Sequence, residues 1–164
     1  MKWDEYRPGN TRLSELVPDD EPVSVVGVMK QQGLFVFAVP LRYMTQGREV
    51  AFHCIGGKPQ RGESYSAALV REAREEVGTH VEVSSASETQ YLTSYADQGM
   101  VHLDDPVRPS VIYKRIRPND PNVEDEATLW LLGYDVTLRD DAPKMRPSAE
   151  VGAILYLTED MLRA

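Results

Sequence analysis

The sequence is poor in cysteine and carries fewer basic than acidic residues. Its 164 residues include one cysteine, Cys54, so no disulfide can form within the chain, and a reducing compartment is the natural environment. Lys and Arg number 18 against 26 Asp and Glu, which gives a formal net charge of −8. A nucleic-acid-binding surface needs a basic stripe. We therefore expect no DNA-binding role.

The chain also lacks a long apolar run. It contains no stretch of about 18 or more apolar residues, the length that a membrane-spanning helix needs. The start, MKWDEYRPGN, has no apolar segment of the kind found in secretory signal peptides. We expect a soluble, cytoplasmic protein without membrane association. With 41% hydrophobic residues, the chain suits one compact domain, residues 21–162, behind an N-terminal extension, residues 1–20.

What the chain does contain is a glycine loop that runs into an acidic helix. The letters GKPQRGESYSAALVREAREEVGT span Gly57–Thr79. Ser64 can cap the start of a helix, and Gly78 can end it in the left-handed conformation. This segment therefore predicts a helix from about Tyr65 to Val77.

Three glutamates, Glu72, Glu75 and Glu76, fall on one face of this helix within an arc of about 100°. Like charges at i,i+4 spacing, as in Glu72 and Glu76, destabilise a helix by roughly 0.2–0.5 kcal/mol. Arg71 can neutralise part of the patch. A divalent cation such as Mg²⁺ can neutralise the rest, because it binds a few carboxylates together with phosphates and water. The alternative is a solvated, charged face on which Arg71 pairs with Glu75.

The opposite side of the helix is apolar and should pack on a sheet. Val70, Ala73 and Val77 lie on this side, with Leu69 at its border. Ala68 sits one turn before Glu72 on the acidic side. Its small side chain would leave room there for a ligand to approach.

The loop and helix together resemble the signature of the Nudix hydrolases, G-x5-E-x7-R-E-U-x-E-E-x-G-U, in which U is apolar. The matching positions are Gly57, Glu63, Arg71, Glu72, Ala73, Glu75, Glu76 and Gly78. Two positions depart from the pattern: Thr79 stands where an aliphatic residue is usual, and Ile55 replaces a proline that often precedes the paired glycines. Neither position carries the chemistry, so the departures concern local packing.

The resemblance implies hydrolysis of a nucleoside diphosphate linked to another moiety, with Mg²⁺ or Mn²⁺ as cofactor. Substrate classes are nucleotide sugars, dinucleoside polyphosphates and nucleoside triphosphates. By similarity, Glu72 and Glu76 are the main metal ligands, the carbonyl of Gly56 is a backbone ligand, and Glu75 is a further ligand or positions water. The alternative is a catalytically silent Nudix-like module that binds or senses nucleotides.

The resemblance also implies that Arg71 orients the glutamates and that Glu63 is its structural ion-pair partner, with Gly57 and Gly78 structural. It leaves the general base open, since family members differ. Glu75 is one candidate. The other candidates lie outside the signature. They are Glu150, just before the last predicted strand, and the acidic cluster at 124–126.

Other residue types invite functional readings that the pattern does not favour. The histidines His53, His80 and His102 lack metal-ligand spacing, and Cys54 lacks a histidine pattern that would make it a nucleophile. Three aromatic residues could stack on a nucleobase, although aromatic residues in strands mostly belong to the core. They are Tyr91, Tyr95 and Trp130.

Short β-rich runs separated by turn residues surround the helix. The predicted strands are Val23–Met29, Leu34–Pro40, Val50–Ile55, Val81–Val83, Thr89–Thr93, Val111–Ile116, Thr128–Val136 and Val151–Leu157. Gln31-Gln32-Gly33 predicts a hairpin, and Thr158 caps a final helix, Glu159–Leu162. Many strands with few helices indicate an α/β fold with a mixed sheet. The resemblance implies a Nudix-like α/β/α sandwich over about 21–162, and an exchange of the N-terminal extension would allow a homodimer.

Overall fold

The structure is a computed structural model that describes residues 11–41, 51–94, 96–116 and 128–164. Its elements are α1 (Leu13–Leu16), β1 (Val23–Gln31), β2 (Leu34–Pro40), β3 (Ile55–Gly57), α2 (Tyr65–Val77), β4 (Val81–Val83), β5 (Thr89–Leu92), β6 (Gln98–Val101), β7 (Val111–Ile116), β8 (Thr128–Leu138), β9 (Val151–Leu157) and α3 (Glu159–Arg163). The predicted mixed α/β fold is confirmed.

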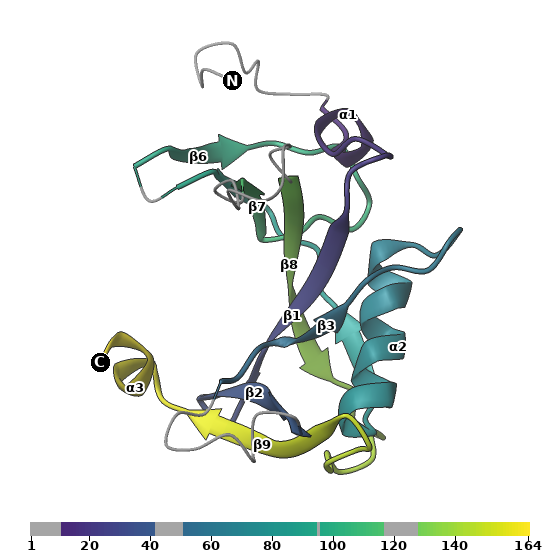
Figure 1. Cartoon of the computed structure of the whole chain (residues 1–164), viewed down its shortest axis with the longest axis vertical. Coiled ribbons are helices and arrows are strands. Elements are labelled where there is room, and N and C mark those ends of the chain that lie inside the picture. Colours follow the sequence, from purple (N-terminus) through teal and green to yellow (C-terminus); the bar gives the residue numbers. More distant parts are fainter. Residues whose placement is uncertain (1–10, 42–50, 95, 117–127) are drawn as a thin grey trace, which may run out of the picture.

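One sheet joins all the described strands in the order β6-β5-β7-β8-β1-β2-β9, with β3 paired to β1 and β4 to β8. The β1–β8 and β5–β7 pairs are parallel and the others are antiparallel, so the sheet is mixed. Helix α2 lies on one side of β1 and β3, while the short α3 lies on the other side (Figure 1). The acidic helix is thereby held against the middle of the sheet.

Helix α2 has the predicted limits because both of its ends are capped. The Ser64 hydroxyl accepts a hydrogen bond from the Ala67 amide at 3.2 Å. At the other end, Gly78 adopts a φ of 66°, the left-handed conformation that glycine favours. Thr79, which departs from the signature, is fully buried, and its hydroxyl donates to the Pro143 carbonyl at 2.7 Å. The departure is therefore accommodated inside the core.

The buried stripe of α2 differs from the prediction. Ala68 is completely buried in the core, so the expectation that it leaves room for a ligand is wrong. Val70, expected on the sheet side, is only partly buried. The stripe is shifted because the acidic side also packs inward, where the Glu76 carboxylate accepts a hydrogen bond from the Gly56 amide.

The strand predicted at Val50–Ile55 is wrong in its limits. Val50 lies outside the described residues, and 51–54 contribute an isolated bridge between His53 and Ala38. The paired strand is β3, whose residues lie opposite 25–27 of β1. A Cβ at Gly56 would lie 2.0 Å from the Val25 carbonyl oxygen, so the glycine itself permits this close pairing.

The sequence predicted the hairpin between β1 and β2 but not strand β6. The predicted hairpin is confirmed, with Gln31 opposite Leu34 and positive φ angles at Gln32 and Gly33. Strand β6 was not predicted, because its QGMV sequence contains a single β-branched residue, Val101, and a glycine, which is depleted in strands.

The described part of the N-terminal stretch packs into the core. Leu13, Leu16 and Val17 are buried, and Thr11 forms a bridge with Leu103. The Leu13 amide donates to the Asp105 carboxylate at 2.8 Å, which fixes α1 to the loop after β6.

Among the helices that the structure describes, none is long and apolar enough to cross a bilayer.

Candidate active site

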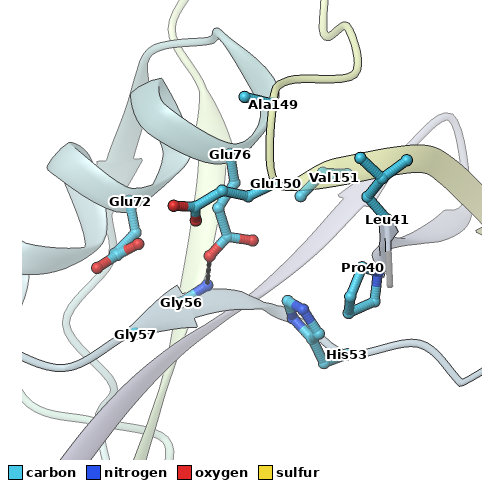
Figure 2. Close-up of a pocket in the computed structure, with 10 residues that line it drawn as sticks. All are labelled: Pro40, Leu41, His53, Gly56, Gly57, Glu72, Glu76, Ala149, Glu150 and Val151. Carbon is cyan, nitrogen blue, oxygen red and sulfur yellow. Dashed lines mark hydrogen bonds between the residues drawn. The ribbon is translucent and has the colours of Figure 1, made fainter. Parts of the chain in front are cut away.

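A cleft of about 530 Å³ lies where β3, α2 and the start of β9 meet. Figure 2 shows three carboxylates, Glu72, Glu76 and Glu150, beside the backbone of Gly56 and Gly57. The first two come from α2, and Glu150 comes from the residue before β9. Elements far apart in the sequence thus bring like charges together around one cleft.

Glu76 is the buried member of this group, with 5% of its surface exposed. One carboxylate oxygen accepts a hydrogen bond from the Gly56 amide at 3.2 Å, and the other is buried with no hydrogen-bond partner among the described residues. Burial raises the pKa of Glu76 to about 7, against the lowering effect of the Gly56 amide. The negative charges of Glu72, Glu150 and Glu75 raise it further. An unpaired buried carboxylate oxygen is costly and calls for a partner.

Glu72 lies directly over the glycine loop. A Cβ at Gly57 would stand 2.4 Å from a Glu72 carboxylate oxygen, far inside contact distance. The absence of a side chain at Gly57 therefore creates the space in which Glu72 sits. This accounts in physical terms for the glycine at the first position of the signature.

Arg71 connects Glu72, which lines the cleft, with Glu63 and Glu75, which do not. It bonds both carboxylate oxygens of Glu63, at 2.9 and 3.1 Å, and it contacts Glu72 at 2.7 Å and Glu75 at 3.0 Å. The hydrogen bonds from the Arg71 side chain to Glu63 are the largest cause of a lowered pKa of the Glu63 carboxyl, and the Gln60 amide lowers this pKa further. The arrangement agrees with an orienting role for Arg71 and a structural role for Glu63.

The candidate general bases lie in different places. Glu150 lines the cleft, and none of the described hydrogen bonds involves its side chain. The Glu75 side chain is 54% exposed, faces Arg71 and does not line the cleft. The acidic cluster at 124–126 lies outside the described residues.

The carboxylates do not form a ready-made metal site. In the described ranges, no three His, Cys, Asp or Glu side chains meet closely enough to hold an ion as they stand. Arg71 draws the carboxylates of Glu72 and Glu75 toward itself, which reduces the repulsion among like charges. A bound cation would have to compete with Arg71 for Glu72.

His53 belongs to the cleft, although the sequence pattern favoured a core or surface position for it. It lies across the cleft from Glu72 (Figure 2). Its Nδ1 is 2.6 Å from the Cys54 carbonyl, which can only accept, so Nδ1 is the donor of this bond, and Nε2 has no hydrogen-bond partner in the part of the chain that the structure describes. The position three residues before Gly56, on the segment entering β3, is the signal that could have placed it.

The other side chains considered from the sequence lie elsewhere. Tyr91 and Trp130 are 4% and 2% exposed and contact each other edge-on, so they belong to the core. Tyr95 lies outside the described residues. Burial raises the pKa of the Cys54 thiol, which opposes a role as nucleophile.

We predict that the free energy of unfolding falls as pH rises from about 5 to about 8 in chelator-treated protein. The pKa of Glu76 is raised from 4.5 to about 7 on folding, so the folded state holds this proton more tightly. Its contribution is complete below pH 4.5 and is lost as pH rises through 7, a loss of roughly 3 kcal/mol at most. Denaturant unfolding at several pH values measures this. The Glu76→Gln profile should be flatter, and identical profiles would contradict the prediction.

The fold and the cleft define a class: an α/β protein with a mixed sheet in which an acidic helix faces a glycine loop. The family model described as NUDIX domain matches residues 21–152. This match spans most of the chain, which therefore belongs to the Nudix hydrolase family. A comparison with curated proteins finds no match.

Solved structures share the fold at low sequence identity. A NUDIX-family hydrolase from Clostridium perfringens is 13% identical with a TM-score of 0.55, over 88% of this chain and 85% of that one. The MutT protein from Methanosarcina mazei Go1 is 13% identical with a TM-score of 0.52, over 90% and 85%. An ADP-ribose pyrophosphatase from Streptococcus suis is 13% identical with a TM-score of 0.51, over 85% and 75%. At such identities the likeness concerns the fold alone.

Proposed function

We propose that this chain is a divalent-cation-dependent hydrolase that cleaves a pyrophosphate bond in a nucleoside diphosphate linked to another moiety. The observation that carries the proposal is the convergence of Glu72, Glu76 and Glu150 on one cleft beside the glycine loop. Three carboxylates in one cleft oppose the binding of a phosphate anion unless cations accompany it. The three carboxylates therefore favour a phosphate substrate that arrives together with such cations.

The residues present fit a hard divalent cation such as Mg²⁺ or Mn²⁺. The unpartnered, buried oxygen of Glu76 is a hard donor that a cation would satisfy. We assign Glu76, Glu72 and the carbonyl of Gly56 as the residues that would hold the ion. Glu75 would be a further ligand or would position water. When bound, the cation supplies neutralisation of phosphate oxygens and activation of water for attack on phosphorus.

The chain's own residues would then position the reaction. Arg71 fixes the Glu72 and Glu75 carboxylates through hydrogen bonds and is itself anchored by Glu63. Glu150 faces the cleft with a carboxylate that no described group engages, so it can accept a proton from the attacking water. We assign it as the general base.

The substrate is expected to be a small nucleotide. The fold-sharing proteins named as an ADP-ribose pyrophosphatase and a MutT protein support a panel that contains ADP-ribose and nucleoside triphosphates. Nucleotide sugars and dinucleoside polyphosphates complete it. We take residues 21–162 as the catalytic domain and retain cytoplasmic location, the absence of DNA binding and a homodimer as proposals.

A product-release screen of this panel tests the proposal. With Mg²⁺ or Mn²⁺, we expect at least one substrate to release a nucleoside monophosphate, and chelator should abolish the release. The identity of the second product reports which phosphorus is attacked. Nucleotide binding without turnover on every substrate would contradict the proposal and would favour the catalytically silent module.

A further inference from the structure

A second cavity lies between α1, the start of α2 and the loop that follows β6. Figure 1 shows α1 above the first turn of α2. The cavity has a volume of about 260 Å³ and shares no lining residue with the active-site cleft. Whatever it binds would therefore be distinct from the substrate of the proposed hydrolase.

A tyrosine that is almost completely buried lines this cavity. Tyr134 of β8 lines the cavity and has 1% of its surface exposed. None of the hydrogen bonds between described residues involves its hydroxyl. The hydroxyl oxygen itself is not enclosed by protein, so it reaches the space of the cavity, where a polar occupant can bond it.

Two tyrosines, Tyr65 and Tyr134, line this cavity together with the carboxylates of Asp19 and Asp105. Burial raises the pKa of Tyr134, and the neighbouring Tyr65 and Asp105 raise it further. Burial likewise raises the pKa of Tyr65, followed by the charges of Asp19 and Asp105. Both phenols therefore stay protonated near neutral pH, and both aspartates are close enough to act on Tyr65.

The negative charge of the cavity is not compensated by the described residues. Neither Asp19 nor Asp105 takes part in an ion pair among them, and the cavity lining contains no Lys, Arg or His. Asp105 uses one oxygen to accept from the Leu13 amide at 2.8 Å. Its other oxygen and the carboxylate of Asp19 remain available to a cationic hydrogen-bond donor.

We propose that this cavity binds a small alkyl ammonium ion. An ammonium group has three N–H donors, and the lining offers the carboxylates of Asp19 and Asp105 and the hydroxyl oxygen of Tyr134 as acceptors. Tyrosine rings attract such a cation, and the apolar side chains of Leu13 and Val107 suit its alkyl part.

A bare metal ion fits the cavity less well. The lining offers two carboxylates, and among the described residues no three acidic, His or Cys side chains here lie close enough together to hold an ion. A metal ion would also make no use of the apolar part of the lining, Leu13 and Val107, which a short alkyl chain can contact.

Isothermal titration calorimetry of the full chain with 1,4-diaminobutane at constant ionic strength tests the proposal. The neutral 1,4-butanediol has the same shape and controls for apolar contact. We expect saturable binding of the diamine and none of the diol. Asp105→Asn should weaken binding about tenfold or more, because it removes a charge-assisted bond, while the amide oxygen can still accept from Leu13.

The active-site cleft is also acidic, so Glu150→Gln is the matched control, and it should change diamine affinity less than twofold. Tyr134→Phe keeps the ring and should weaken binding about threefold or more, since it loses one hydrogen bond. Asp19→Asn replaces Asp105→Asn if that variant does not fold. Equal binding of the diol, no saturable heat up to about 10 mM, or an equal loss in Glu150→Gln and the aspartate variant would overturn the proposal.

Discussion

Replacement of Glu76 by Gln, and separately of Glu72 by Gln, is expected to lower kcat by about 10³-fold while the fold is retained. Each change removes one negative charge from the cleft in which a cation and a phosphate must be held together. A 10³-fold loss corresponds to about 4 kcal/mol of transition-state stabilisation. Steady-state kinetics on a substrate from the panel, with magnesium affinity measured in parallel, gives the result.

The fold should survive because glutamine keeps the shape and one acceptor. In Glu76→Gln the amide oxygen can still accept from the Gly56 amide, and the uncompensated buried charge is gone. Its free energy of unfolding above pH 7 should therefore equal or exceed that of the wild type. Glu82→Gln, an exposed carboxylate on β4, is the matched control and should keep wild-type kcat. Near-normal turnover in both cleft variants would rule out the assignment.

Local signals made α2 and the hairpin predictable. A cap residue, Ser64, and a left-handed terminator, Gly78, act within a few residues of the helix that they limit. The turn at Gln32 and Gly33 is equally local. These features depend on short-range backbone chemistry, which a single sequence contains in full.

The rotation of α2 was not predictable from periodicity. Apolar spacing alone placed Val70 on the sheet and Ala68 on the open side, whereas the structure buries Ala68. The side of α2 that is buried depends on the hydrogen bond between the Glu76 carboxylate and the Gly56 amide, two residues that lie 20 positions apart in the sequence. A polar residue at a buried position hides the true stripe from any hydrophobicity pattern.

The composition of the cleft depends on sheet register. His53 enters it because its backbone bridges to Ala38, and Leu41 and Val151 approach it because β2 pairs with β9. Such long-range pairings leave no mark on the local sequence. The signature could therefore place the glutamates of α2 but not the opposite wall of the cleft.

Glu150→Gln is expected to lower kcat by roughly 10²- to 10⁴-fold, the range for loss of a general base. Magnesium affinity should change far less than in Glu76→Gln, because the role assigned to Glu150 is to accept a proton. Glu75→Gln is the comparison and should lose less, since that side chain is 54% exposed and faces Arg71.

The backbone contacts favour Glu150 as a fixed base. Its carbonyl accepts from the Leu41 amide at 2.9 Å, its amide donates to the Ser148 hydroxyl at 3.2 Å, and Val151 pairs with Pro40. A base must be held within reach of the attacking water, and these bonds anchor its main chain to the wall of the cleft. A larger loss in Glu75→Gln than in Glu150→Gln would transfer the role to Glu75, and Arg71 would then have to release that carboxylate for catalysis.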